Sequence, residues 1–210
     1  MIEIDGLGMT VGGTAVFENC SAALESGTVT LVRGVSGSGK TTLVRAIAQL
    51  EQYSGSIRFD GVEASHVRDR LYACLDDAPL IPYLNGYDNV RMLAGRADSN
   101  DRIRSAAPSV AGDALLRRAA HELSVGQRKR VHLVAAVCGR ADYLVFDDIL
   151  SGIDAPTVAE LAPALREPAR GATVLLTARP DDGLESVASH QLLIAKCQLV
   201  AKPEVARVLA

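Results

Sequence analysis

The clearest structural signal in the chain is an apolar, β-branched run at residues 28–32, T-V-T-L-V, which has the composition of a short buried parallel strand. A glycine-rich loop follows it. Residues 41–50 then carry apolar side chains at helical spacing, at Leu43, Val44, Ile47 and Leu50. The pattern therefore predicts a strand, a loop and a helix in direct succession.

The loop between this strand and this helix reads G-V-S-G-S-G-K-T over residues 34–41, which matches the phosphate-loop pattern G-x-x-x-x-G-K-[ST] without a mismatch. Unpaired amides and a partial positive charge gather at a helix N-terminus, so it can hold phosphate oxygens. We expect Lys40 to reach the β- and γ-phosphates of a nucleoside triphosphate and the Thr41 hydroxyl to ligate Mg²⁺. The nucleotide-binding residues predicted here are Gly34, Ser36, Gly37, Ser38, Gly39, Lys40, Thr41 and Thr42.

Composition sets the class of protein. The 210 residues are 48% hydrophobic, which suits one domain with a full core. A net charge of −3 and a pI near 5.8 argue against nucleic acid as a partner, since residues 127–130 form the one basic cluster that stands out. Four widely separated cysteines in apolar surroundings indicate reduced thiols. No apolar run approaches the roughly 20 residues that a membrane-spanning helix needs.

The second half of the chain carries three further motifs in order. Residues 123–127 read L-S-V-G-Q, between two segments that we expect to be helical, 114–122 and 128–139. An apolar strand over residues 143–146 ends in Asp147 and Asp148, and an S-x-x-D loop follows at residues 151–154. Together with the phosphate loop, this order of motifs resembles the ATP-binding-cassette (ABC) ATPases. The resemblance covers nearly the whole chain.

The resemblance implies an α/β fold in three parts: a phosphate-loop ATPase core with a mostly parallel sheet, an N-terminal antiparallel β subdomain and a small helical subdomain. The β subdomain would hold residues 2–27 and a returning strand at 56–59 that ends at the turn pair Asp60-Gly61. Residues 1–210 would form a single ABC ATPase domain, with the helical subdomain inserted at 76–122.

The resemblance also implies a head-to-tail pair of such domains with ATP and Mg²⁺ bound between them. Ser124, Gly126 and Gln127 would then contact the nucleotide held by the partner's phosphate loop, and Arg128, Lys129 and Arg130 would follow beside it. Asp147 would hold Mg²⁺. Val125 replaces the first glycine of the family's signature, and we expect it to weaken that contact.

Four positions around the phosphate loop depart from the family's pattern. Asp148 replaces the family's catalytic glutamate and is one methylene shorter. Arg179 replaces the switch histidine and, unlike histidine, stays protonated. The glutamine before the helical insertion corresponds to Asp76, a carboxylate that could contact Mg²⁺. Val11 occupies the position at which the family has an aromatic residue that stacks on adenine, and Phe17 is expected in the core. These changes predict a site that binds ATP and hydrolyses it slowly, assisted catalytically by Lys40, Asp148 and Arg179.

Three functions follow from the resemblance. The first is the ATPase subunit of a membrane transporter, bound at the cytoplasmic face of the cell membrane to a transmembrane permease subunit and to a second ABC ATPase subunit, as a hetero- or homodimer. The second is a soluble ABC ATPase outside transport, and the third is a non-catalytic ATP-binding regulatory subunit. Residues 81–84 and Tyr87 are candidates for the permease docking surface or for ordinary packing.

Overall fold

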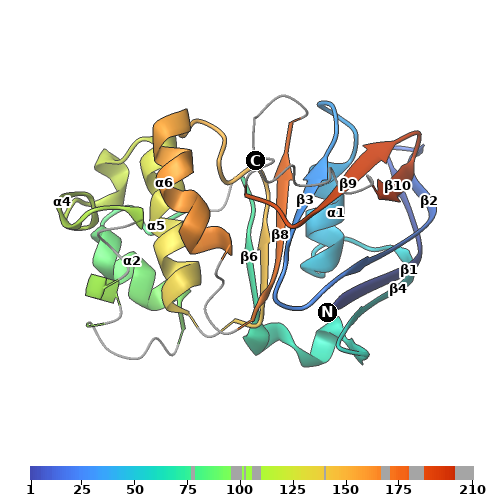
Figure 1. Cartoon of the computed structure of the whole chain (residues 1–210), viewed down its shortest axis with the longest axis horizontal. Coiled ribbons are helices and arrows are strands. Elements are labelled where there is room, and N and C mark those ends of the chain that lie inside the picture. The colour runs from blue at the N-terminus through green and yellow to red at the C-terminus, as the bar shows by residue number, and fades with distance from the viewer. Residues whose placement is uncertain are drawn as a thin grey trace, which may run out of the picture.

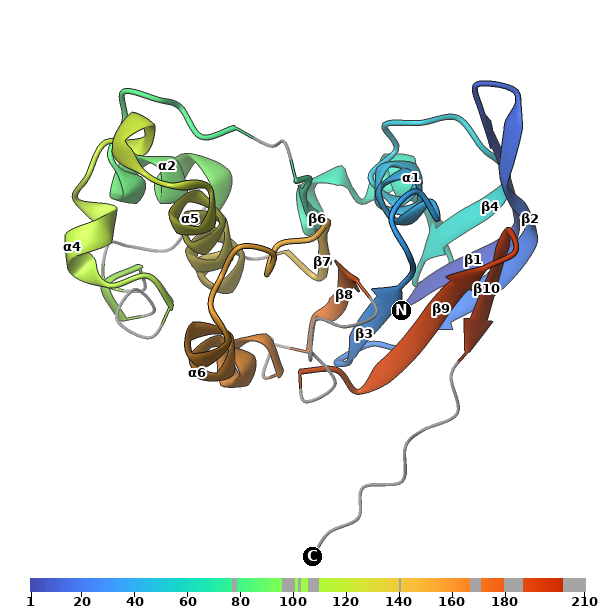
Figure 2. The same cartoon turned by 90° about the horizontal axis from the view of Figure 1, so that it is seen from above.

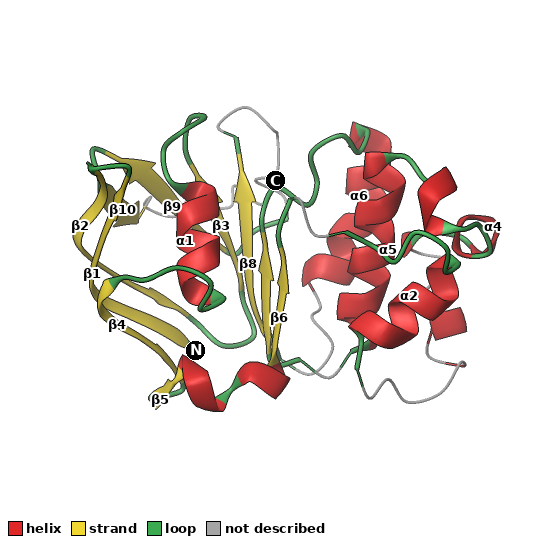
Figure 3. Cartoon of the chain, turned by 180° about the vertical axis from the view of Figure 1, so that it is seen from behind, coloured by secondary structure: helices red, strands yellow, loops and turns green. Residues whose placement is uncertain are grey.

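The computed structural model describes residues 1–76, 79–95, 101, 103–105, 110–139, 141–166, 171–179 and 187–201. Helices gather on one side of the molecule, a mostly parallel sheet stands in the middle, and an antiparallel sheet closes the other side (Figure 1). The same division is visible from behind, where most helices occupy one half, and the half with the strands also holds one helix between the two sheets and short helical turns near the N-terminus (Figure 3). The predicted α/β fold with a mostly parallel sheet and an antiparallel β region is confirmed.

The central sheet has the strand order β10-β9-β3-β8-β7-β6. Its strands are β3 (Val29–Arg33), β6 (Leu71–Cys74), β7 (Tyr143–Phe146), β8 (Thr173–Ala178), β9 (His190–Ala195) and β10 (Gln198–Ala201). The pairs of β3 with β8 and β9, of β7 with β8 and of β6 with β7 are parallel, whereas β10 is antiparallel to β9. Every residue of β3, β7 and β8 is buried, as expected for parallel strands covered on both faces.

The second sheet has the order β2-β1-β4-β5 and contains β1 (Ile2–Val11), β2 (Thr14–Leu24), β4 (Ser54–Phe59) and β5 (Val62–Glu63). The predicted turn at Asp60-Gly61 connects β4 to β5, and both residues have a positive φ, 51° and 77°. A two-residue hairpin loop favours this conformation because its twist matches that of the strands.

Helix α1 (Lys40–Ile47) lies between the two sheets (Figure 2) and buries Leu43, Val44, Ala46 and Ile47 against them. The predicted apolar stripe is therefore correct at three of its four positions. Leu50 is exposed, because the helix ends before it and Gln49 turns the backbone at φ 59°.

The helical side contains α2 (Gly86–Leu93), α4 (Asp113–Leu116), α5 (Val125–Cys138) and α6 (Ala155–Arg166). Short 3₁₀ turns occupy Ala64–His66, Arg68–Arg70 and Ala120–Glu122. The predicted continuous helix over 114–122 is wrong: α4 ends at Leu116, and Ala119 then forms a β-bridge with Asn85. The helix predicted from 128 begins three residues earlier, because Ser124 and Gln127 form a capping box at its start.

Among the described residues, no helix is long and apolar enough to cross a membrane. None of the four cysteines forms a disulfide within the described residues; Cys20, Cys74 and Cys138 are buried, and Cys197 is half-buried. Burial raises the pKa of the Cys74 thiol to about 12, so this side chain stays protonated at neutral pH.

Candidate functional site

The phosphate loop, residues 34–41, joins the buried strand β3 to α1 and needs glycine at its two ends. A Cβ on Gly34 would lie 2.2 Å from Ser38 Oγ, so a side chain there would collide with the loop itself. Gly39 has φ 106°, and a Cβ on it would lie 2.5 Å from Val16 Cγ1 on β2. The loop is therefore held close to the antiparallel sheet, and its curvature depends on residues without side chains.

Lys40 lies back over the phosphate loop. Its ammonium donates to the carbonyl oxygens of Gly34 at 2.6 Å and Val35 at 3.0 Å. Ser36, Gly37 and Thr41 are exposed, and Gly39 and Thr42 are half-buried. Among the described residues, the buried Ser38 Oγ has no hydrogen-bond partner. The loop thus combines a cationic group, exposed backbone and an unpaired hydroxyl at the N-terminus of a helix, which is the chemistry that phosphate oxygens require.

The Gly39 geometry gives a prediction with an internal control. Gly39→Ala combines a positive φ with a steric collision, whereas Gly37→Ala has a positive φ of 79° but open space around the new methyl group. Strain of this kind costs about 1–3 kcal/mol, and each kcal/mol lowers the melting temperature of a domain this size by about 2–4 °C. Without nucleotide, we expect Gly39→Ala to melt about 4 °C or more below Gly37→Ala. Equal melting temperatures would show that Val16 does not restrict the loop.

The two acidic residues that follow β7 have different surroundings. Asp147 is 1% exposed, and its Oδ1 accepts a hydrogen bond from Thr177 Oγ1 at 2.8 Å. Its Oδ2 is buried and has no hydrogen-bond partner among the described residues. A buried carboxylate oxygen without a partner is costly unless it meets a cation or water. Asp147 therefore fits the predicted metal site, with an oxygen ligand of the kind that Mg²⁺ prefers.

Asp148 is held through its backbone. It has φ 49°, a left-handed conformation that is uncommon for residues other than glycine. Its amide donates to Thr177 Oγ1 at 2.8 Å, and its carbonyl accepts from Lys129 Nζ at 2.7 Å. Burial raises the pKa of the Asp148 carboxyl, while Lys129 nearby works in the opposite direction. Thr177, which the sequence did not single out, thus orients both acidic residues.

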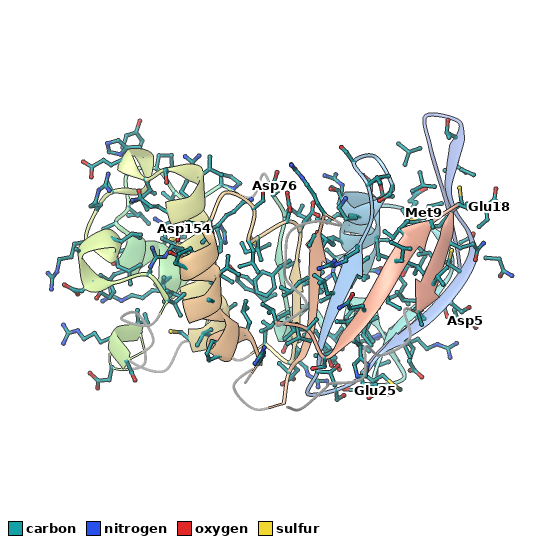
Figure 4. All side chains as sticks on the ribbon, turned by 45° about the horizontal axis from the view of Figure 1, so that its top comes forward. Asp5, Met9, Glu18, Glu25, Asp76 and Asp154 are labelled. Atoms are coloured by element: carbon teal, nitrogen blue, oxygen red, sulfur yellow. The ribbon has the colours of Figure 1, made fainter. Side chains whose placement is uncertain are left out.

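Asp76 and Arg179 complete the group of altered positions. Asp76 lies at the boundary between the helices and the strands (Figure 4) and forms an ion pair with Lys129, 2.7 Å between Oδ1 and Nζ. In this structure the Asp76 carboxylate is therefore bound by a lysine of its own chain. Arg179 is exposed at the end of β8, close enough to Asp148 to lower the pKa of its carboxyl.

The predicted signature forms the N-terminus of α5. Ser124 Oγ accepts from the Gln127 amide at 3.2 Å, and Gln127 Oε1 accepts from the Ser124 amide at 3.0 Å. A Cβ on Gly126 would lie 2.8 Å from the carbonyl oxygen of Gly152, so the glycine allows close contact with the S-x-x-D loop. Val125 points into solvent, 55% exposed. Within the basic run after the signature, Lys129 is buried, whereas Arg128 and Arg130 are half-buried.

Val11, the predicted adenine contact, is exposed at the end of β1 beside the Gly12-Gly13 turn. Phe17 is buried, as expected, and its ring lies near Gly39. Val16, the neighbour of Phe17 on β2, also lies against the phosphate loop. Strict alternation would not predict this, but the pairing of β1 with β2 is irregular here, because Met9 pairs with Phe17 and Thr10 with Ala15.

Comparisons with known proteins agree with the motifs. The sequence model of the family described as "ABC transporter" matches residues 17–151. The hemin import ATP-binding protein HmuV of Jannaschia sp. (strain CCS1) is 30% identical, over 97% of this chain and 82% of that protein. The sulfate/thiosulfate import ATP-binding protein CysA of Escherichia coli (strain K12) is 34% identical over 79% of this chain, but over 49% of its own length, so this chain spans about half of it.

Among solved structures, a putative ABC transporter ATP-binding protein from Pyrococcus furiosus superposes with a TM-score of 0.78. The superposition covers 92% of this chain and 96% of that one, at 23% sequence identity. This likeness concerns the fold.

Proposed function

The chain belongs to the ABC transporter family of ATP-binding proteins, and on that premise we propose that it is the energy-coupling subunit of a transporter, with weak hydrolysis at its own site. Members of the family bind ATP and generally hydrolyse it. The observation that carries the proposal is the complete phosphate loop together with a buried carboxylate oxygen of Asp147 that has no partner in the part of the chain that the structure describes. Residues 1–210 are proposed as one ATPase domain, with residues 76–122 as its helical insertion.

Each residue of the site has a proposed role. The backbone of residues 34–41 and the Lys40 ammonium hold the phosphates, and Thr41 and Asp147 hold Mg²⁺. When bound, Mg²⁺ neutralises phosphate charge. The side chain of Asp148 orients the attacking water, and its backbone is fixed on both sides by Thr177 and Lys129.

The proposed hydrolysis is slow for two chemical reasons. The Asp148 side chain is one methylene shorter than glutamate, and an error of about 1 Å in placing a reacting group can cost about a hundredfold in rate. An arginine at position 179 can pair with phosphate but cannot exchange a proton as a histidine does. These substitutions also favour the second candidate, a subunit that binds ATP without hydrolysing it.

The first proposed partner, a transmembrane subunit, is suggested by the family and by the names of the relatives. HmuV and CysA are named as ATP-binding proteins of import systems. We place this chain against a transmembrane permease subunit at the cytoplasmic face of the membrane. Ile81 and Tyr83 support this placement, because both are exposed apolar side chains on the loop that precedes α2, and Tyr83 is 87% exposed. Charge does not suggest nucleic acid.

A second ABC ATPase subunit is the other proposed partner. The signature at Ser124, Gly126 and Gln127 is nearly intact, while the residues around this chain's own phosphate loop are altered. An asymmetric pair explains both features, since this signature would complete an active site on a partner that carries the usual glutamate and histidine. A homodimer in which Asp148 is sufficient is the competing arrangement.

A single-turnover assay with the isolated chain in excess over ATP tests the proposed weak site. We expect ATP to bind in the presence of Mg²⁺ and to be cleaved much more slowly than once per second. Cleavage at several per second would contradict the weak site and favour the homodimer. If ATP binds and no cleavage is measurable, the non-catalytic role is favoured.

A further inference from the structure

Lys129 is a buried cation within the chain's own nucleotide site. The residue is 6% exposed, although lysine is rarely buried unless its charge is paired. Its ammonium reaches three oxygen atoms: Asp76 Oδ1 at 2.7 Å, the Asp148 carbonyl at 2.7 Å and the Ser151 carbonyl at 3.3 Å. An ammonium group has three donors, so these contacts use its full capacity. Lys129 thereby connects α5 to the loops that follow β6 and β7.

The contact with Asp148 helps to hold the backbone of Asp148 in its strained left-handed conformation. Left-handed residues other than glycine persist where their surroundings fix them from several sides. At Asp148, Thr177 accepts from the amide and Lys129 donates to the carbonyl. Without Lys129, one of these two constraints is lost, and the turn that aims the Asp148 side chain is free to relax.

The contact with Asp76 neutralises a charge. Asp76 follows β6, Asp147 and Asp148 follow the adjacent β7, and the parallel strands place all three carboxylates at the sheet edge that carries the phosphate loop. A nucleoside triphosphate brings further negative charge to this edge. The Asp76 side chain is 58% exposed and able to face a ligand, so its charge would oppose binding unless a cation offsets it.

We infer that Lys129 is a positioning residue of the nucleotide site: it neutralises Asp76, which favours ATP over ADP, and it fixes the Asp148 turn. The inference rests on the proposed ATP-binding function and extends it. The two effects are separable. The charge effect depends on Asp76 and acts on affinity, whereas the backbone effect does not depend on Asp76 and acts on the rate of cleavage.

A double-mutant cycle tests the inference. ATP and ADP affinities are measured by titration with Mg²⁺ for the wild type, Lys129→Met, Asp76→Asn and the double variant. We expect Lys129→Met to weaken ATP binding about tenfold and ADP binding about threefold or less, the scale of one nearby charge in a partly solvated site. Adding Asp76→Asn should return ATP affinity to within about threefold of the wild type. Single-turnover cleavage should be slower than in the wild type both in Lys129→Met and in the double variant, because the Asp148 carbonyl lacks its Lys129 donor in both.

Stability is controlled with Cys138→Ala, which removes a buried sulfur at the far end of α5. This variant should lower the melting temperature and leave the ratio of ATP to ADP affinity unchanged. Equal weakening of ATP and ADP by Lys129→Met, or no recovery with Asp76→Asn, would overturn the inference and leave Lys129 a packing residue. If the wild type does not bind ATP at all, the proposed function fails, and the inference fails with it.

Discussion

Lys40→Ala lowers the affinity of the chain for ATP by at least about a hundredfold. The reason is that Lys40 supplies the point charge of the phosphate loop. Its ammonium lies over the loop, bound to the Gly34 and Val35 carbonyls, and alanine offers nothing to replace it at the β- and γ-phosphates. Hydrogen bonds to charged groups contribute about 1.5–3 kcal/mol each, and every 1.4 kcal/mol is a tenfold change in affinity, so the loss of two such contacts accounts for the effect.

The control for Lys40→Ala is Arg45→Ala, measured in the same ATP titration. Arg45 is a cation of the same helix, in its last turn, and forms an exposed ion pair with Glu51. Exposed pairs contribute little to stability, so the control should fold normally and bind ATP within about twofold of the wild type. An affinity of Lys40→Ala within threefold of the wild type would exclude the phosphate loop as the nucleotide site.

Asp148→Glu accelerates single-turnover cleavage of ATP by about tenfold to a hundredfold. The added methylene extends the carboxylate by about 1 Å and restores the reach expected of the group that orients the attacking water. Glutamate suits the left-handed backbone of this position less well than aspartate, so a small loss of melting temperature is expected as well.

Asp148→Asn is the matched control for the added reach, because it keeps the length of the side chain and removes the charge. It should reduce cleavage below the wild-type rate and leave ATP affinity nearly unchanged. Cleavage that does not rise in Asp148→Glu would show that the short carboxylate is not what slows the reaction. The Arg179→His variant, alone and combined with Asp148→Glu, then tests the switch position in the same assay.

The sequence predicted the parts of this structure that local chemistry determines. A β-branched run became β3, the loop with its glycines joined it to α1, and Asp60-Gly61 formed the turn that its residue types favour. The motifs also predicted that Asp147 and Asp148 follow a buried strand, which is β7 of the sheet that carries the loop.

What the sequence could not predict involves residues brought together from distant segments. Lys129 was expected beside the nucleotide of a partner, yet it is buried, and the loops after β6 and β7 of its own chain place three oxygen atoms around it. Asp76, whose carboxylate could contact Mg²⁺, pairs with this lysine, a contact that the sequence did not predict. The helical spacing of Leu50 predicted that it would be buried, but Leu50 is exposed because the backbone turns at Gln49. These outcomes depend on tertiary contacts that spacing alone does not contain.

The measurement that tests the central claim most directly is purification of the tagged chain from its native membranes in mild detergent, with mass spectrometry and the stoichiometry of the proteins that accompany it. We predict a transmembrane subunit together with a second ABC ATPase that carries the glutamate and histidine that Asp148 and Arg179 replace here. A transmembrane subunit with two copies of this chain, and no other ATPase, would contradict the asymmetric pair and show that these substitutions support hydrolysis.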